Sequence, residues 1–178
     1  DNIRMNVAVI PARGGSKRIL KKNIKEFCGK SIIAWPIEAA RRSGLFQKIL
    51  VSTDDEEMKN EGIKFGLDAP FTRPAALATD EASAIDVWKH ALIESENYYN
   101  KSFDITILLE PSSPFRKAYH ITETIEKLIS GKFETVLTVS KTDSKSHPLK
   151  QLVLKGDLIN VFDKKSEKVI VRQQLNPV

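Results

Sequence analysis

The sequence predicts an α/β protein with a doubly wound, mostly parallel sheet. Short apolar runs alternate with longer segments of helical periodicity along residues 7–139. This alternation is typical of parallel sheets that helices cover on both faces. The first run, Val7–Ile10, is apolar at every position and too short for a helix. It therefore predicts a strand that is buried on both faces.

A long basic loop and a helix are expected after this strand. The loop covers Pro11–Asn23 and contains two glycines and five basic residues. The helix is expected over Ile32–Arg42, with Ser31 as its N-cap and Gly44 at its end. Because Pro36 lies inside this pattern, we expect a kink or a later start.

The next elements continue the alternation. A strand is expected at Lys48–Ser52, and a helix capped by Asp54 or Asp55 should run to about Phe65. Further helices are expected at Ala84–Glu94 and Ile121–Ile129, and further strands at Thr106–Leu109 and Thr135–Val139. Ligands of such sheets bind at the carboxyl ends of the strands, so we expect the functional site there.

The pattern changes after His147. Gln151–Leu154 and Leu158–Val161 flank the turn sequence Lys155–Asp157, which predicts a β-hairpin. Val169–Val171 is a candidate for one more strand. We expect this antiparallel section to be an oligomerisation arm within a single domain of residues 1–178.

Composition excludes several classes of protein. Charged residues make up 29% of the chain and apolar residues 41%, which is typical of a globular domain and not of a disordered one. The single cysteine, Cys28, excludes a disulfide framework within the chain and a zinc site built on paired cysteines. No apolar run approaches the ~20 residues of a membrane span. We therefore expect a cytoplasmic protein without a membrane partner.

The net charge of +5 favours a polyanionic partner, either a nucleoside triphosphate or a nucleic acid. The basic loop is the candidate site for phosphate. Gly14 and Gly15 would let the backbone approach an anion, and Arg13 can form bidentate bonds to phosphate. Lys22 could neutralise charge on a departing pyrophosphate. The loop matches neither the Walker pattern nor Gly-x-Gly-x-x-Gly, so a solvated basic loop or one that touches nucleic acid also remains open.

Several motifs in the same order resemble one known family. They are Ala12–Lys17, Lys22–Asn23, Val51–Asp54, Arg73–Pro74, Leu77–Asp80, Pro111–Arg116, His147–Lys150 and Arg172–Leu175. With them the chain resembles the CMP-sialic acid synthetases (acylneuraminate cytidylyltransferases), which activate nonulosonic acids with CTP. The resemblance implies a Rossmann-like nucleotidyltransferase fold. It also implies a homodimer whose arm, residues 147–175, reaches into the site of the partner subunit.

The resemblance further implies roles for individual residues. Arg13 and Lys22 would be catalytic. The nucleotide would be bound by Ala12, Arg13, Gly14, Gly15, Ser16, Asn23, Arg73, Asp80 and Ser83. The sugar would be bound by Glu110, Ser112, Ser113, Lys150, Arg172 and Gln173. Mg²⁺ would be the cofactor.

The sequence departs from the family at several points: Leu20 and Ser31 stand where proline is common, and two further departures bear on the chemistry. Glu110 stands where many members have glutamine, and its carboxylate would repel an acidic sugar unless it is protonated or bridged. It could instead bond a hydroxyl or an amine-derived substituent. Family members also continue beyond the arm with a segment that carries an Asp-x-Asp pair for Mg²⁺. We expect this chain to lack that segment and its metal ligands, because Asp54–Asp55 is the one adjacent aspartate pair and fits a helix cap better.

Three alternatives remain open at this point. The first is a synthetase for Kdo or another sugar nucleotide. The second is an α/β domain that binds nucleic acid, against which the aromatic content of 7% and the lack of a known motif argue. The third is a non-catalytic fragment that keeps the nucleotide loop.

Overall fold

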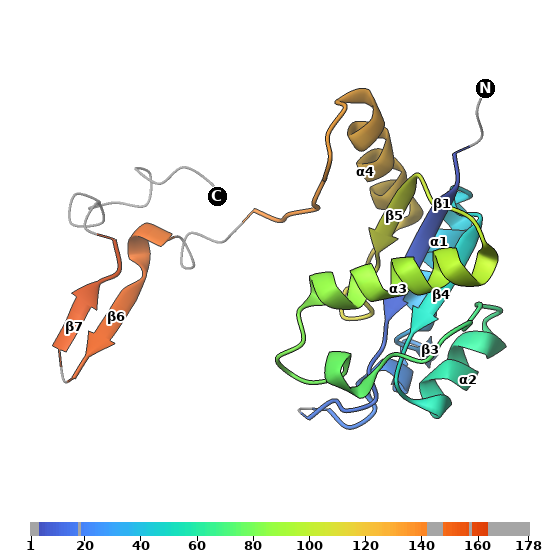
Figure 1. Ribbon diagram of the computed structural model, residues 1–178. Coiled ribbons are helices and arrows are strands. Elements are labelled where there is room, and N and C mark those ends of the chain that lie inside the picture. The colour runs from blue at the N-terminus through green and yellow to red at the C-terminus, as the bar shows by residue number, and fades with distance from the viewer. Residues whose placement is uncertain (1–3, 18, 142–147, 157, 164–178) are drawn as a thin grey trace. The chain divides into compact units, whose positions relative to one another are not determined.

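The computed structural model describes residues 4–17, 19–141, 148–156 and 158–163 (Figure 1). The chain divides into two compact units, Asp1–Val136 and Leu137–Val178, and each is described by itself. The expectation of one domain over residues 1–178 stays a prediction. No helix in the described ranges is long and apolar enough to cross a membrane.

The first unit is built on a parallel sheet of three strands. These are β1 (Asn6–Pro11), β4 (Lys48–Ser52) and β5 (Ile105–Leu108), in the order β4-β1-β5. Val9 of the central strand lies opposite Leu50 on one side and Leu108 on the other. Val7–Ile10 has no exposed surface, which confirms the predicted strand buried on both faces.

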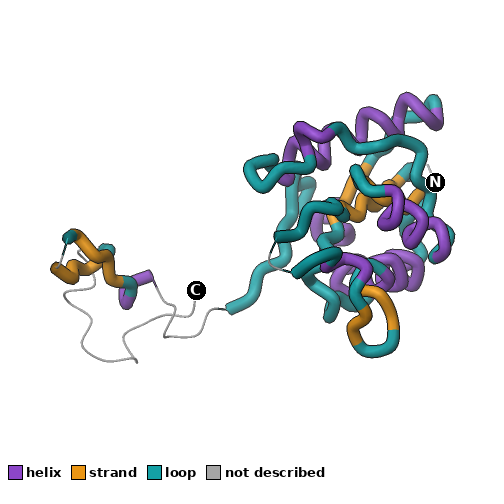
Figure 2. The backbone as a smooth tube through the Cα atoms, turned by 90° about the horizontal axis from the view of Figure 1, so that it is seen from below, coloured by secondary structure: helices purple, strands orange, loops and turns teal. Residues whose placement is uncertain are grey.

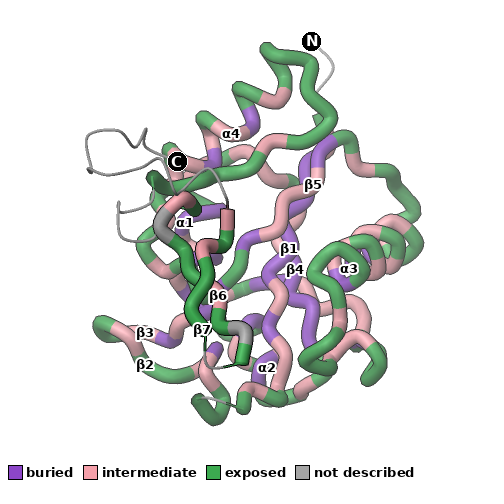
Figure 3. The backbone as a smooth tube through the Cα atoms, turned by 90° about the vertical axis from the view of Figure 1, so that its left-hand side faces the viewer, coloured by how far each residue is buried: buried purple, intermediate pink, exposed green. Residues whose placement is uncertain are grey.

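Helices cover both faces of this sheet, as Figures 1 and 2 show. They are α1 (Ala34–Ser43), α2 (Glu56–Lys64), α3 (Ala84–Tyr99) and α4 (Ala118–Ser130). Side chains of α1, α2 and α4 share one apolar core with Ala8, Ile10 and Val51. Helix α3 contacts β1, and its buried residues include Val87 and Ala91. Figure 3 shows the buried positions concentrated on β1 and β4.

The start of α1 differs from the sequence prediction. Ser31 is not its N-cap, because it is buried in β3 (Lys30–Ser31), which forms a hairpin with β2 (Glu26–Phe27). The helix begins at Ala34, so the expected later start is confirmed. Pro36 then lies in the first turn, where its missing N–H has no partner to lose.

The strand predicted at Thr135–Val139 is wrong. These residues form no strand in the structure, although their type favours one. A strand needs a neighbouring backbone to bond with, and a cavity lies between Thr135–Val136 and β5. Thr135–Val139 therefore has residue types that favour a strand, but among the described residues no neighbouring backbone pairs with it at the outer edge of β5.

The second unit contains the predicted hairpin. β6 (Leu152–Lys155) pairs antiparallel with β7 (Leu158–Val161), and Leu152 lies opposite Val161. Gly156 between them has a φ of 61°, in the left-handed region that favours glycine. A short 3₁₀ turn, η4 (Pro148–Lys150), precedes β6. The strand predicted at Val169–Val171 lies outside the described residues.

Candidate functional site

A polar cavity lies at the carboxyl ends of β1 and β5. From β1 the chain passes first to β4 on one side and later to β5 on the other, so the order of the strands reverses beside β1. Ligands of open α/β sheets bind at such a point. The cavity has a volume of about 270 Å³. It is lined by Pro11, Arg13, Ser16, Lys22, Asn23, Arg73, Leu77, Thr79, Asp80, Ala82, Ala84, Val87, Leu108, Glu110, Pro111 and Ser112.

The basic loop is held at both ends. Ala12, which is fully buried, donates its N–H to the carbonyl of Ser52 at 2.9 Å. The Asn23 side chain donates to the carbonyl of Arg13 at 3.3 Å, which ties the end of the loop to its start. Lys21 forms an ion pair with Glu57 in the first turn of α2. These contacts fix the described ends of the loop against β4 and α2.

Gly14 lies against the start of α2. Its N–H donates to Oδ1 of Asp54 at 3.0 Å. A Cβ at this glycine would lie 2.7 Å from Cβ of Asp55, closer than real contacts allow. Asp55 is fixed there because its carboxylate caps α2 through the N–H of Met58 at 3.0 Å, as the sequence predicted. Only a glycine fits at position 14, whereas a Cβ at Gly15 would meet nothing within 4 Å.

One carboxylate in the cavity neutralises two cations of the loop. Oδ1 of Asp80 lies 2.6 Å from Nη2 of Arg13, and Oδ2 lies 2.5 Å from Nζ of Lys17. The bond to Lys17, followed by that to Arg13, lowers the pKa of Asp80 below its ordinary value. The structure thus brings together Arg13 and Asp80, both predicted site residues, and adds Lys17 to them.

The Arg73 side chain is hydrogen-bonded to Ser52 at the end of β4. It is only 4% exposed, and its Nε donates to Oγ of Ser52 at 3.1 Å while Nη2 donates to the carbonyl of Ser52. Burial lowers the pKa of Arg73, and the nearby charge of Asp54 opposes that shift. Arginine stays charged nevertheless, so this residue adds a fixed positive charge to the cavity wall.

The turn after β5 forms the opposite wall. Glu110 and Ser112 line the cavity, as predicted for sugar contacts. The carbonyl of Glu110 accepts bonds from the N–H of Ser113 at 3.2 Å and from Nη1 of Arg116 at 3.3 Å. Burial lowers the pKa of Arg116, and Glu110 opposes the shift. The side chain of Glu110 is exposed and free to meet a ligand.

Some predicted site residues are not part of this wall. Ser83 caps α3 through the N–H of Ile85 at 3.2 Å, and its neighbours Ala82 and Ala84 line the cavity instead. Ala12, Gly14, Gly15 and Ser113 belong to the surrounding loops and do not line the cavity. Among the predicted sugar contacts in the second unit, the side chain of Lys150 and all of Arg172 and Gln173 lie outside the described residues.

The sequence analysis missed two contributors. Asp54 was predicted as a possible helix cap and as part of one motif, without a role at the loop, but it accepts a bond from the backbone of Gly14. Lys17 was part of the basic loop motif without a role of its own, but it shares Asp80 with Arg13. The position of Asp54 directly after a strand was an available signal, whereas no spacing connects Lys17 to Asp80.

The described residues contain no cluster of three or more side chains that could hold a metal ion. Two carboxylates line the polar cavity. Asp80 is already neutralised by two cations, and Glu110 comes from a different loop. These two carboxylates do not form a divalent metal site among the described residues.

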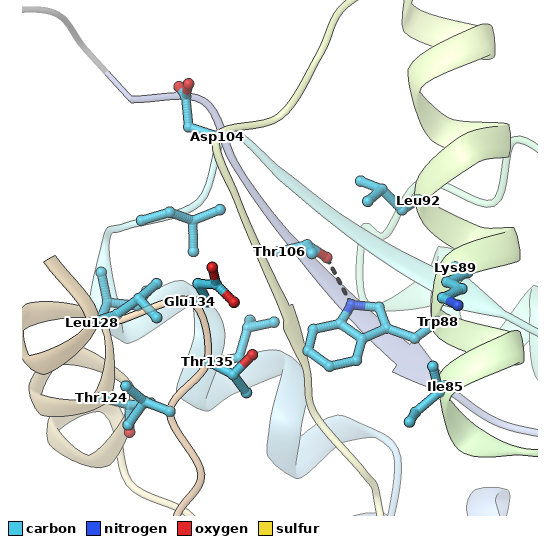
Figure 4. A pocket seen from close by; sticks show the side chains of 14 residues that line it. Ile85, Trp88, Lys89, Leu92, Asp104, Thr106, Thr124, Leu128, Glu134 and Thr135 are labelled. Carbon is cyan, nitrogen blue, oxygen red and sulfur yellow. Dashed lines mark hydrogen bonds between the residues drawn. The ribbon is translucent and has the colours of Figure 1, made fainter. Parts of the chain in front are cut away.

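A second cavity, of about 360 Å³, lies at the outer edge of β5 (Figure 4). Its walls are mainly apolar and come from α3, α4, β5 and residues 134–136. Trp88 of α3 reaches across it and donates from Nε1 to Oγ1 of Thr106 at 2.8 Å (Figure 4). This second cavity lacks the several cations that line the first cavity. The first cavity is therefore the candidate site for an anionic ligand.

Comparison with known proteins shows which family this chain matches. Residues 7–176 match a family model described as cytidylyltransferase. A pseudaminic acid cytidylyltransferase of Campylobacter jejuni subsp. jejuni serotype O:23/36 (strain 81-176) is 34% identical over 165 residues, which are 92% of this chain and 69% of that protein. An N-acylneuraminate cytidylyltransferase of Escherichia coli O18:K1:H7 (strain RS218 / NMEC) is 37% identical over 147 residues, 82% of this chain and 34% of that protein.

A solved structure shows the same fold. The synthetase for CMP-2-keto-3-deoxy-manno-octonic acid, solved with CTP, superposes with a TM-score of 0.61 at 22% identity. The match covers 93% of this chain and 69% of that chain. This likeness confirms the doubly wound α/β fold expected from the sequence.

Proposed function

Because the chain belongs to the cytidylyltransferase family, we propose that it transfers the cytidylyl group of CTP to a nonulosonic acid. One observation carries the proposal: Arg13, Ser16 and Lys22 of the loop after β1 line one polar cavity at the reversal of strand order. This is where a triphosphate would meet cations and loop amides together.

The reaction follows from the chemistry of the two substrates. The anomeric hydroxyl of the sugar attacks the α-phosphorus of CTP and loses its proton to water. A new P–O bond forms, the bond from the α-phosphorus to the bridging oxygen breaks, and pyrophosphate leaves with that electron pair. The protein contributes positioning and neutralisation of charge.

The cations of the loop would hold the triphosphate. Arg13 would bind phosphate oxygens in a bidentate manner, and Ser16 would donate its hydroxyl. Lys22 would stabilise the charge that grows on pyrophosphate in the transition state. The first turn of α3 also lines the cavity, and a helix N-terminus favours an anion.

The nucleoside and the sugar would occupy opposite ends of the cavity. Asn23 and Arg73 would border the cytosine and ribose, and both line the wall near the basic loop. Glu110 and Ser112 would contact the sugar from the turn after β5. The family resemblance adds Lys150, Arg172 and Gln173 of a partner's arm to the sugar end.

A homodimer is part of the proposal, and the hairpin of the second unit supports it. Apolar side chains on this hairpin are 61% to 70% exposed: Leu152, Leu154, Leu158 and Ile159. A two-stranded hairpin with an apolar surface has little stability by itself in water. Packing against a second copy of the chain would cover that surface.

Mg²⁺ is also proposed, as a companion of the substrate. The described carboxylates do not form a metal site, but phosphate oxygens of a nucleotide bind Mg²⁺ without one. The ion would then enter with CTP and reduce the repulsion between two anionic substrates.

Calorimetry tests the nucleotide part of the proposal. CTP is expected to bind more tightly than UTP, ATP or GTP in the presence of Mg²⁺. A panel of N-acetylneuraminic, pseudaminic, legionaminic and 2-keto-3-deoxy-octonic acids, with detection of pyrophosphate, then identifies the sugar. Equal affinity for all four nucleotides would contradict a cytidylyltransferase, and pyrophosphate release with the octonic acid alone would contradict a nonulosonate enzyme.

A further inference from the structure

The phosphate-binding cations already have an anionic partner within the chain. Arg13 and Lys17 extend from the loop after β1, and Asp80 comes from the segment between η2 (Ala75–Leu77) and α3. Each oxygen of the Asp80 carboxylate contacts one of these cations, at 2.6 and 2.5 Å. The carboxylate thus bridges a guanidinium and an ammonium group as a phosphate would.

A triphosphate and Asp80 cannot both use these donors fully. A phosphate oxygen that binds Arg13 would lie next to the ionised Asp80 carboxylate. The two negative charges would then repel each other. The two ion pairs must therefore loosen before phosphate takes their place. Arg73 does not exchange one anionic partner for another, because its guanidinium is buried and bonded to Ser52.

We propose that Asp80 is the resident counter-ion of the phosphate site: it holds Arg13 and Lys17 in place in the free protein, and the triphosphate displaces it. The inference rests on the proposed function, since it concerns the same site. It gives Asp80 a role in setting triphosphate affinity, in place of a contact to cytosine or ribose.

The surroundings of Asp80 permit this displacement. Its side chain is 40% exposed, so it can turn into water without leaving a buried charge unpaired. The segment is anchored on both sides, by the bond from Ala78 N–H to the carbonyl of Ala75 and by the Ser83 cap of α3. Movement can therefore be confined to the few residues between these anchors.

The substitution Asp80→Asn tests the inference, because it removes the charge and keeps the size. We expect tripolyphosphate and CTP to bind about threefold to tenfold more tightly, the range for two partly exposed ion pairs that no longer compete. Both ligands should gain by the same factor, since the effect concerns phosphate alone. Titration calorimetry measures both, with thermal unfolding as the check of the fold.

Glu81→Gln is the matched control. Glu81 is exposed on the same segment, and its substitution changes the net charge of the protein by the same amount. Affinity for tripolyphosphate should change by less than about twofold in this variant, because Glu81 does not line the cavity and its exposed charge is screened by salt. An equal gain in both variants would assign the effect to net charge and overturn the role of Asp80.

Two other outcomes also overturn the inference. If Asp80→Asn leaves tripolyphosphate binding unchanged or weaker, Asp80 does not compete for these cations. If CTP loses affinity relative to tripolyphosphate, Asp80 contacts the nucleoside instead. Absence of tripolyphosphate binding in the unsubstituted protein is a separate result: it refutes the phosphate site of the proposed function, and the inference with it.

Discussion

Lys22 is the residue on which the proposed chemistry depends most. It lines the polar cavity from η1 (Lys22–Ile24), on the same loop as Arg13 and Ser16. Because its charge would act on pyrophosphate as that group departs, it contributes more to the transition state than to the bound substrate.

The substitution Lys22→Ala should therefore separate turnover from binding. We expect kcat to fall by about 100-fold or more, the size found when one such electrostatic group is removed. The dissociation constant for CTP should change much less, because Arg13 and Ser16 remain. Steady-state kinetics and calorimetry measure the two effects, and equal losses in both would refute the transition-state role.

Gly14 and Gly15 are adjacent glycines with different constraints. At Gly14 a Cβ would collide with the Asp55 side chain, whereas at Gly15 it would meet open space. Gly14→Ala should push the loop away from α2 and weaken CTP binding by about tenfold, since a small displacement of positioning groups has large effects. Gly15→Ala is the control, and it should bind CTP nearly as well as the unsubstituted protein. Similar affinities for the two variants would show that the contact with α2 does not position the loop.

At the scale of elements, Asp68, in the segment after α2, connects the end of α3 to β4. Asp68 accepts bonds from the hydroxyl of Tyr99, at the end of α3, and from Lys48 at 2.9 Å. The bond from Tyr99, followed by that from Lys48, lowers the pKa of Asp68 below its ordinary value of 3.8. A carboxylate with a lowered pKa stabilises the fold above its unfolded pKa, and this stabilisation is lost as pH falls through the folded value.

The substitution Tyr99→Phe should lower the free energy of unfolding by about 1 kcal/mol at neutral pH, the usual value of such a bond. The difference from the unsubstituted protein should shrink as pH falls below the ordinary pKa of an aspartate, about 4, and through the lowered pKa of Asp68 in the folded protein. Denaturant unfolding at several pH values measures it. Tyr98→Phe is the control, because Tyr98 is 65% exposed. A loss that is independent of pH would exclude the ionised Asp68 as the acceptor.

Local signals predicted most elements, and non-local contacts account for the errors. The cap of α2 at Asp55 and the buried strand β1 could be predicted because neighbouring residues determine them. Thr135–Val139 could not, since strand formation depends on a backbone from elsewhere in the chain. The site follows the same division: the basic loop is a local motif, whereas the bond from Gly14 to Asp54 and the sharing of Asp80 depend on the tertiary fold.

At the scale of the whole molecule, the proposed nucleotide site and the proposed arm belong to different units. All residues that line the polar cavity belong to the first unit, Asp1–Val136. The arm proposed for sugar contacts belongs to the second. Nucleotide binding and sugar use should therefore separate between the units.

A chain of residues 1–136 should bind CTP within about threefold of the whole chain, because no group that lines the cavity is removed. It should fail to use the sugar, since the arm is absent. Calorimetry and pyrophosphate detection measure these effects, and circular dichroism serves as the check of folding. Loss of CTP binding by a folded chain 1–136 would show that the second unit contributes to the nucleotide site.

The hairpin should control association. Leu154 is 69% exposed on the apolar surface of the hairpin. Leu154→Lys places a charge on this surface, so it should shift a dimer towards monomers. Light scattering after gel filtration measures the mass. Lys64→Ala, at the end of α2 in the first unit, is the control and should leave the mass unchanged. A dimer of unchanged stability in Leu154→Lys would place the interface elsewhere.

Within the part of the chain that the structure describes, the sheet of the first unit ends at β5, and this has a consequence for the amide protons of its strands. Leu109 donates its N–H inward to the carbonyl of Val9 at 2.9 Å. Since alternate N–H groups of a strand point to opposite sides, those of Thr106 and Leu108 point away from β1. In heavy water these two should exchange far sooner than the amides of β1, which is paired on both sides. Any backbone that came to bond along this edge would slow them first, so their exchange rates report directly whether the edge is covered.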